Sequence, residues 1–484
     1  MNSQKLKKTS LVVEEIGKVV EISEPVVKIK GLPYVFMEEL LDIEGKEAVV
    51  LSFNKDFTFA LLLEDAGDLK PETLVKRTKK VFKIPVGKEL IGKIINPLGK
   101  DIDTQILIET KEKREIERTP PEIMEREEIH QPLETGIKII DALFPIGRGQ
   151  RQLILGDRET GKTTLALDAI LKQKDIICIY TIIGQGRSES AQIVKTLKEE
   201  GASAYTIVVA AFSSHSPVLR YLAPFSAMTI AEYFREQGKD VLIVFDDLTK
   251  HAWAWRELSL LLNRPPGRED YPGDIFYLHA RLLERAAKFN EKSGGGSITA
   301  LPICETKEGD ISGFIPTNLI SITDGQLYLE PDLFQKGIRP AINIGLSVSR
   351  VGSKAQQKCI KEVTQGLKLV LSQHKELKKL LQLESKLSEE AKKRFKRGEV
   401  LLEIFKQEKH KFVDVLDQSI MYWAILNGFL DDVDLNNIKK FEFRFYDFID
   451  DIYPQLKEKV KKYGWSKKVE TEMKKAILEF KTMQ

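Results

Sequence analysis

Cysteine is scarce in this chain of 484 residues, which has only Cys178, Cys304 and Cys359. The three are far apart and odd in number, and none belongs to a CxxC pair. This spacing argues against a disulfide framework and against a cysteine-based zinc site. We therefore expect three free thiols in a protein of a reducing compartment.

Long apolar runs are also missing. No segment reaches the roughly 18 uninterrupted apolar residues that a membrane-spanning helix needs. The N-terminal sequence MNSQKLKKTS is basic but has no apolar stretch of the kind that signal peptides carry. We expect an intracellular protein that contacts a membrane only through partners.

A strong excess of one charge is the third absence. Lys and Arg number 75 against 72 Asp and Glu, so the formal net charge is only +3. This balance argues against a protein built to coat nucleic acid or an anionic membrane. The 42% of hydrophobic residues and 30% of charged residues are typical of a globular protein with a sizeable core. A sequence of this length predicts about three domains.

Three zones of different texture follow one another, and we place them at residues 1–80, 81–354 and 355–484. In the first, short runs such as EAVVLSF and FTFALLLE alternate with turn residues, which predicts a six-strand β-barrel. In the second, apolar runs such as RQLILGD and DVLIVFDD alternate with amphipathic stretches, which predicts a parallel sheet covered by helices. The third is rich in Lys and Glu and has helical periodicity. The sequence thus predicts a multidomain α/β protein with an N-terminal barrel and a C-terminal helical domain.

The clearest motif is G-x-x-x-x-G-K-T, which follows the apolar run RQLIL and opens the helical stretch TLALDAIL. In this context successive backbone N–H groups and the helix N-terminus attract phosphate oxygens. A lysine in the motif reaches the terminal phosphates, and the hydroxyl after it can bind Mg²⁺. We therefore predict a phosphate-binding loop of eight consecutive residues: Gly156, Asp157, Arg158, Glu159, Thr160, Gly161, Lys162 and Thr163.

The second half of such a site is an acid at the end of a neighbouring strand. The run DVLIVFDD ends in Asp246 and Asp247, and one carboxylate would hold Mg²⁺ through water. An Asp in this place also often caps the next helix. We assign Thr163 and Asp246 to the metal.

Hydrolysis of a nucleotide needs a group that positions the attacking water and takes its proton. In ring ATPases of this architecture, that residue ends the strand after the loop helix. Here the strand DIICIYTIIG is followed by Gln185. An amide can hold a water but cannot accept its proton. We expect a protein that binds Mg-nucleotide and hydrolyses it slowly.

Several long stretches together carry a resemblance to a known family. They read GDRETGKT from residue 156, RPPGREDYPGDIFYLHARLLER from 264, PTNLISITDGQ from 316 and GIRPAINIGLSVSRVGS from 337. In this order and spacing the sequence resembles the α subunits of F-type ATP synthase over nearly its whole length. The catalytic β subunits of that family have Glu at the position that Gln185 occupies here.

The resemblance implies a fold and a set of partners. In the family, α and β subunits alternate in a hexameric ring around a γ shaft, and each has a barrel, a RecA-like nucleotide domain and a helical domain. The α subunit holds ATP or ADP with Mg²⁺ at non-catalytic interfaces. For this protein the resemblance implies β, γ and stator (δ- or b-like) partners, no nucleic acid, and a peripheral position on the cytoplasmic face of a bacterial plasma membrane. It leaves the coupling ion, H⁺ or Na⁺, open.

The resemblance also implies roles for single residues. Arg350 matches the arginine finger that enters the β site, and Ser321 matches a residue close to that site. Arg339, Pro340 and Gln407 match residues that line the adenine pocket. The sequence departs from the family at Lys409, where a second Gln is common, at Gly186, where Lys is common, and before the barrel, where only MNSQKLKKTSLVV stands in place of a longer stator-binding helix.

Three alternatives remain at this stage. A self-sufficient hexameric ATPase of the export type would need Glu in place of Gln185. An RNA-translocating hexameric helicase would need a basic barrel face with exposed aromatics, and the barrel zone has few aromatics beyond Tyr34 and its phenylalanines. A degenerate ring subunit without nucleotide is disfavoured by Lys162 and Thr163.

Some conspicuous residues fit none of these motifs. His251 and His279 have no partner pattern, and we expect them to be hydrogen-bonded polar residues rather than ligands. Trp253 and Trp255 are expected to serve packing.

Overall fold

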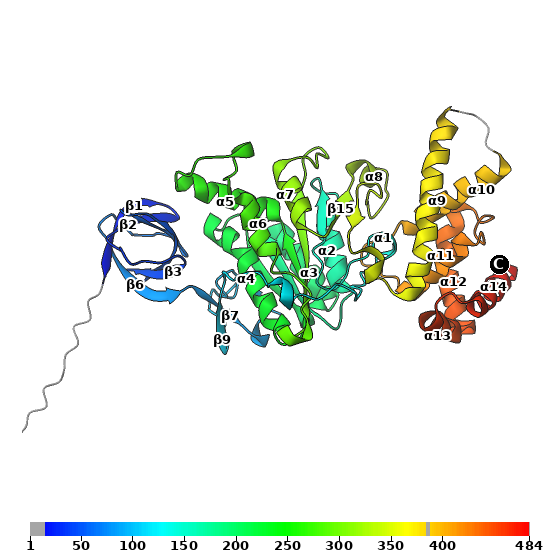
Figure 1. The fold of residues 1–484 in the computed structure, drawn as a ribbon, viewed down its shortest axis with the longest axis horizontal. Coiled ribbons are helices and arrows are strands. Elements are labelled where there is room, and N and C mark those ends of the chain that lie inside the picture. Colours follow the sequence, from blue (N-terminus) through cyan, green and yellow to red (C-terminus); the bar gives the residue numbers. More distant parts are fainter. Residues whose placement is uncertain (1–14, 384–387, 484) are drawn as a thin grey trace, which may run out of the picture.

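The computed structural model describes residues 15–383 and 388–483, and these form three units in a row along the long axis of the molecule (Figure 1). The N-terminal segment MNSQKLKKTSLVV, which stands in place of the family's longer stator-binding helix, lies outside the described residues. Among the described helices, none combines the length and the apolarity that crossing a membrane requires.

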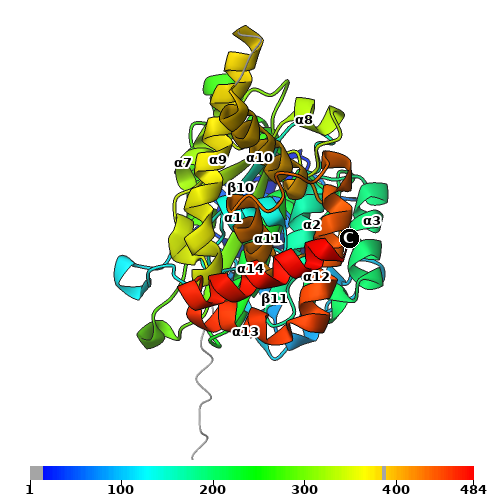
Figure 2. The ribbon, with the colours of Figure 1, turned by 90° about the vertical axis from the view of Figure 1, so that its right-hand side faces the viewer.

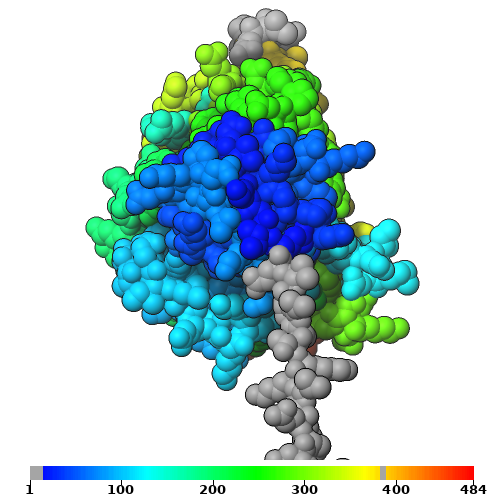
Figure 3. All heavy atoms as spheres, turned by 90° about the vertical axis from the view of Figure 1, so that its left-hand side faces the viewer, coloured from blue at the N-terminus to red at the C-terminus, as the bar shows by residue number. Residues whose placement is uncertain are grey.

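The first unit is a closed barrel of six strands, as predicted. Neighbouring strands pair in the order β1-β2-β5-β4-β3-β6, and every pair is antiparallel. Inward residues alternate with outward ones, and side chains such as Ile29 and Leu41 are fully buried inside. Closure removes the sheet edges that an open sheet would expose. Figure 3 looks onto the barrel end of the molecule. The strands are β1 (Ile16–Ser23), β2 (Val26–Lys30), β3 (Glu39–Ile43), β4 (Lys46–Phe53), β5 (Thr58–Leu62) and β6 (Leu74–Val81).

The second unit contains an eight-stranded sheet in the order β16-β15-β10-β14-β13-β11-β12-β8. All neighbouring strands are parallel except β15 and β16. Both faces are covered, which explains why the predicted strands are continuous apolar runs. The strands are β8 (Ile94–Ile95), β10 (Leu153–Gly156), β11 (Ile177–Ile183), β12 (Thr206–Ala211), β13 (Asp240–Asp246), β14 (Ser297–Glu305), β15 (Gly325–Leu329) and β16 (Val348–Ser349).

Alternate residues of one strand enter different cores. On β11, Tyr180 and Ile182 pack into the core that continues into the C-terminal unit, whereas Ile179 and Ile183 pack into the core shared with α4 and α5. The period-2 geometry of a strand produces this division. The helices of this unit are α1 (Lys138–Leu143), α2 (Lys162–Leu171), α3 (Arg187–Glu199), α4 (Pro217–Arg235), α5 (Leu248–Leu261), α6 (Ile275–Leu283), α7 (Phe314–Ile322) and α8 (Pro331–Gln335).

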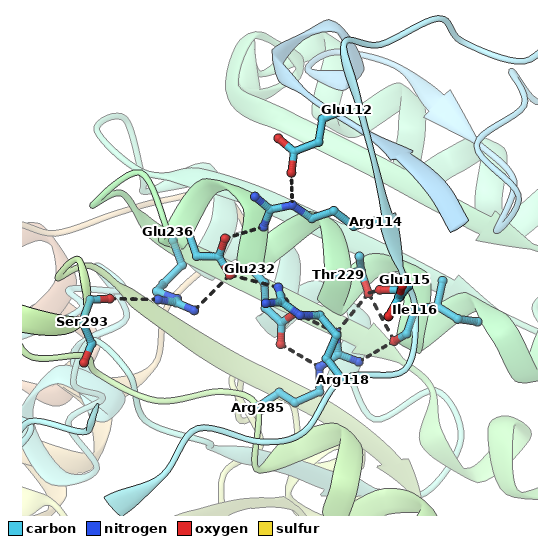
Figure 4. Close-up of polar contacts among 11 residues, drawn as sticks. Glu112, Arg114, Glu115, Ile116, Arg118, Thr229, Glu232, Glu236, Arg285 and Ser293 are labelled. Atoms are coloured by element: carbon cyan, nitrogen blue, oxygen red, sulfur yellow. Dashed lines mark hydrogen bonds and ion pairs between the residues drawn. The ribbon is translucent and has the colours of Figure 1, made fainter. Parts of the chain in front are cut away.

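The connection from the barrel is tied to the central unit by a polar network (Figure 4). It includes β9 (Glu112–Glu115), which pairs with β7 (Lys83–Val86). Arg285, whose exposed fraction is 1%, donates two hydrogen bonds to the Glu232 carboxylate, at 2.7 and 2.9 Å, and one to the carbonyl of Ile116 at 2.8 Å. A buried guanidinium is tolerated only with such partners, so this network fixes the connecting segment on α4.

The third unit is helical and faces the viewer in Figure 2. Its core is continuous with one face of the central sheet. At the junction the Lys138 ammonium donates to the Glu442 carboxylate at 2.7 Å, and both side chains are buried. The helices are α9 (Lys358–Leu383), α10 (Glu389–Phe405), α11 (Val415–Leu426), α12 (Ile438–Ile452), α13 (Pro454–Tyr463) and α14 (Lys467–Thr482).

Of two histidines in the central unit, His251 is hydrogen-bonded as expected and His279 is not. The ring Nε2 of His251 donates to the carbonyl of Tyr221 at 3.1 Å, whereas within the described residues neither ring nitrogen of His279 has a hydrogen-bond partner. Burial lowers the pKa of His279 to about 4. The ring is therefore neutral and packs as an aromatic, with its centroid 5.5 Å from that of His251.

Candidate functional site

The phosphate-binding loop joins β10 to α2, as the motif predicts. β10 ends at Gly156, and Gly161 adopts a left-handed φ of 97° immediately before α2 begins at Lys162. Glycine takes this conformation without the steric cost that a Cβ imposes. The Lys162 ammonium donates to the carbonyl of Asp157 at 2.5 Å, across the mouth of the loop. The α2 N-terminus and this ammonium place positive potential where anionic phosphates would lie.

Asp157 is an anchor of the loop rather than a group facing a ligand. Its carboxylate accepts from the Thr306 hydroxyl at 2.5 Å and from the backbone N–H of Gly309 at 2.9 Å. The Thr160 hydroxyl donates to the Asp157 carbonyl at 2.8 Å. These bonds tie the loop to the segment after β14, a contact about 150 residues distant that the motif alone does not indicate.

The exposed side chains of the loop lie apart from these anchors. Arg158 and Glu159 are both exposed, and the Arg158 guanidinium reaches the Glu189 carboxylate at 3.5 Å. Glu159 has a positive φ of 63°. An L-residue in this conformation costs energy and is common where a loop is shaped for function.

Two hydroxyls and one carboxylate meet beside the loop. The Thr163 hydroxyl donates to Asp246 Oδ2 at 2.9 Å, and the buried Tyr180 hydroxyl donates to the same oxygen at 2.6 Å. Hydroxyl and carboxylate oxygens are ligands that Mg²⁺ prefers. The arrangement therefore fits a magnesium ion bound between this pair and a nucleotide, directly or through water. Sequence reasoning missed Tyr180, because an apolar strand run does not reveal which of its side chains points at the acid.

The two neighbouring aspartates have different tasks. Asp246 faces Thr163, whereas the Asp247 carboxylate accepts from the backbone N–H of Lys250 at 2.8 Å and so caps α5. Burial raises the pKa of Asp247 to about 6, and the nearby Asp246 charge adds to the rise. Burial also lowers the pKa of Lys162, although the surrounding carboxylates partly oppose this decrease. The capping interpretation of this pair therefore applies to Asp247, whereas the position of Asp246 beside Thr163 fits the metal-binding interpretation.

Gln185 lies just after β11, at the carboxyl edge of the sheet. Its amide Nε2 is 3.4 Å from the carbonyl of Asp246, so it belongs to the same corner as the Thr163–Asp246 pair. The side chain is buried. At this point of the site an amide stands where hydrolysis would require a proton acceptor.

The predicted adenine-pocket residues come together from distant parts of the sequence. The backbone N–H of Gln407 donates to the carbonyl of Arg339 at 2.7 Å, and Pro340 follows Arg339 directly. The Arg339 guanidinium lies 4.6 Å from the ring centroid of Phe334. Phe334 in turn lies against the phosphate loop, 3.9 Å from where a side chain on Gly161 would begin. Sequence reasoning missed Phe334.

The Gln407 side chain is engaged by backbone groups. Its Oε1 accepts from the N–H of Lys138 at 2.9 Å, and its Nε2 donates to the carbonyl of Gly136 at 2.8 Å and to that of Lys411. In this arrangement the Gln407 amide is engaged by backbone groups of the chain itself.

Arg350 and Ser321 are neighbours on another surface. Both are exposed. The Arg350 guanidinium donates to the carbonyl of Ile320 at 3.3 Å, beside Ser321, and the Ser321 hydroxyl donates to the carbonyl of Thr317 at 3.0 Å. The structure thus brings the two predicted trans-acting residues together.

Strand register places that surface away from the protein's own phosphate loop. Gly156 pairs with Leu329 at the carboxyl end of β15, whereas Ser349 pairs with Gly325 at its amino end. Four residues of strand span about 13 Å. Arg350 therefore lies at the opposite edge of the sheet from the loop.

Comparison with known proteins agrees with this geometry. The model of the ATP synthase alpha/beta family nucleotide-binding domain matches residues 136–349, and the model of the C-terminal domain of the ATP synthase alpha/beta chain matches residues 356–480. The sequence is 49% identical over 471 residues to the protein described as ATP synthase subunit alpha of Helicobacter acinonychis (strain Sheeba), which covers 96% of this chain and 94% of that relative. The resemblance that the motifs indicate is confirmed: the chain belongs to the ATP synthase alpha/beta family, among the alpha subunits of F-type ATP synthase.

Proposed function

We propose that this α subunit holds ATP or ADP with Mg²⁺ at its own loop without hydrolysing it quickly, and that it completes the catalytic site of a neighbouring β subunit. Gln185 is the observation that carries the first half. It lies in the corner formed by Thr163 and Asp246, where a hydrolytic site needs a carboxylate.

In the proposed site the α subunit's own residues bind and orient the nucleotide. Lys162 and the backbone N–H groups at the start of α2 hold the phosphates, and Phe334 and the Arg339–Pro340 segment form the base side. Thr163 and Asp246 hold the metal. Bound Mg²⁺ would offset phosphate charge, while Gln185 can orient a water but leaves its proton in place.

The second half of the proposal rests on Arg350. An exposed arginine about 13 Å along the strand from the phosphate-binding loop of its own subunit is too far away to act on phosphates bound there. A guanidinium stabilises the charge that develops on a transferring phosphoryl group. Such a group arriving from outside a site is an arginine finger, and we assign Ser321 to the same interface.

The proposed partners follow from these two roles, nucleotide binding at the α site and the contribution of Arg350 to a β site. An α subunit that lends Arg350 needs β subunits beside it, which supports an alternating ring around a γ shaft, held by stator subunits and reaching the cytoplasmic face of the membrane through the complex. An export-type ATPase or a helicase that works alone would need a carboxylate in place of Gln185.

The test uses the isolated full-length protein. Equilibrium binding of Mg-ATP is measured beside phosphate release, and we expect binding with turnover far below that of the assembled complex. Lys162→Ala should abolish binding, whereas Lys195→Ala, an exposed lysine on α3, should bind as the unchanged protein does. Turnover by the isolated protein near that of the complex would refute a non-catalytic role.

A further inference from the structure

Between α10 and α11 the polypeptide passes over the nucleotide domain as a short segment, residues 406–414, which we call the strap. Its first part forms the base side of the proposed nucleotide site, because the N–H of Gln407 donates to the carbonyl of Arg339 at 2.7 Å. Its last part lies beside the start of α1 and the end of α2. The N–H of Val413 donates to the carbonyl of Gly136 at 3.1 Å, and the Lys172 ammonium donates to the Asp414 carboxylate at 2.5 Å.

The middle of the strap contacts α2 through one pair of residues, His410 and Asp168, which are joined by two hydrogen bonds. His410 donates its backbone N–H to Asp168 Oδ1 at 3.2 Å, and its ring Nδ1 lies 2.7 Å from the same oxygen. A carboxylate oxygen only accepts, so the ionised Asp168 requires the proton on Nδ1. Both side chains are largely buried, with exposed fractions of 21% for His410 and 10% for Asp168.

The backbone of His410 shows that this contact is maintained at a cost. Its φ is 60°, in the left-handed region that an L-residue rarely adopts. Such a conformation persists where the surrounding contacts over-determine it. Here the two bonds to Asp168 are those contacts.

The place of Asp168 on α2 gives the contact its meaning. α2 begins at Lys162, which closes the phosphate loop, and Asp168 lies six residues later, about 9 Å along the helix. One rigid helix therefore carries both the phosphate end of the site and the anchor of the strap. The His410–Asp168 contact sets the distance between the phosphate end and the base side.

We propose that His410 is a positioning residue for the nucleotide at this subunit's own site: by its bond to Asp168 it holds the strap against α2 and slows nucleotide release. This inference rests on the proposed nucleotide site. Without the ring bond, the middle of the strap keeps the backbone bond from His410 to Asp168 and the bond from Gln407 to the carbonyl of Lys411, and it is held less tightly against α2.

The experiment measures how fast a fluorescent ATP derivative, methylanthraniloyl-ATP with Mg²⁺, leaves the full-length protein when excess ATP is added. His410→Ala should speed release about tenfold, the factor expected for losing a hydrogen bond to a charged group. His410→Asn, whose amide N–H reaches the same Asp168 oxygen, should restore the rate to within about twofold. Lys411→Ala, an exposed side chain on the same strap, is the matched control and should leave the rate unchanged.

A double-mutant cycle separates positioning from general loosening. Asp168→Ala removes the ring bond and the backbone bond, so it should speed release at least as much as His410→Ala does, and the double variant should be no faster than Asp168→Ala alone. Wild-type release rates in His410→Ala, fully additive effects, or no rescue by His410→Asn would each overturn the inference. Thermal unfolding of each variant checks that the protein is folded.

Lys162→Ala distinguishes this outcome from failure of the proposed function. If the unchanged protein binds no nucleotide, both proposals fall. If it binds and Lys162→Ala does not, the site is correct and the strap variants alone decide the role of His410.

Discussion

Replacing Arg350 by alanine should slow ATP hydrolysis in an assembled α/β ring, while the α subunit stays folded and keeps nucleotide bound at its own site. Arginine fingers contribute about 10³–10⁵ in rate, which corresponds to about 4–7 kcal/mol of transition-state stabilisation. The structure predicts little loss of stability, because among the residues that the structure describes the exposed guanidinium makes one hydrogen bond, to the carbonyl of Ile320 at 3.3 Å. Substitutions at such surface positions usually change stability by about 0.5 kcal/mol or less.

Nucleotide affinity at the α site should also remain unchanged. Four residues of β15 separate the pairing partner of Gly156 from that of Ser349, so about 13 Å of strand lies between the phosphate loop and the start of Arg350. The guanidinium donates to the carbonyl of Ile320, near the C-terminal end of α7.

The assay is steady-state hydrolysis by reconstituted α/β rings, with binding at the α sites followed separately. Arg350→Lys should rescue poorly, because an ammonium cannot span two phosphoryl oxygens as a planar guanidinium does. Arg444→Ala, an exposed arginine on α12, is the control for loss of a surface charge. Near-normal turnover by Arg350→Ala, or an equal loss of α-site binding, would refute the assignment in trans.

Two further predictions concern stability. Arg285→Ala leaves Glu232 as a buried, partly unpaired charge, so the free energy of unfolding in denaturant should fall by about 3–5 kcal/mol. The control is Lys195→Ala, which breaks an exposed ion pair and should lower the free energy of unfolding by less than about 1 kcal/mol. Equal losses in the two variants would contradict the argument that the buried network stabilises the fold. Burial, with some help from neighbouring carboxylates, raises the pKa of Glu38 from its ordinary 4.5 to about 7, so the neutral form favours the fold, and this contribution to stability is present below pH 4.5 and lost as the pH rises to 7. The unfolding temperature should therefore fall less between about pH 5 and 7.5 in Glu38→Gln than in the unchanged protein. Glu47→Gln, at an exposed position on the same barrel, should show the same fall in unfolding temperature with pH as the unchanged protein. An identical fall in all three proteins would show that Glu38 does not titrate in this range.

Much of the fold was predictable because its signals are local. A buried parallel strand is an apolar run, an inside–outside strand alternates, and a helix repeats every 3.6 residues, so six barrel strands and the principal sheet strands could be inferred from short windows. The phosphate-binding loop is local in the same sense, since Gly156 to Thr163 form one strand–loop–helix turn. The presence of an amide rather than a carboxylate at Gln185 is likewise given directly by the sequence.

What only the tertiary structure decided are relations between segments far apart in the sequence. That Asp246 faces Thr163 while Asp247 caps α5 depends on where α2 lies beside β13. The remoteness of Arg350 from its own loop depends on the register of β10, β15 and β16.

The contact between the strap and α2 is the clearest example of such a relation. His410 and Asp168 are 242 residues apart, and neither lies in a motif. Their contact exists because the helical unit packs one of its connecting segments across α2, and the order and crossings of strands and helices are set by the sum of many burial contacts rather than by any short pattern. The sequence by itself therefore determined which chemical groups the protein carries, and the three-dimensional fold determined which of them lie beside its own phosphate loop and which lie at the opposite edge of the sheet.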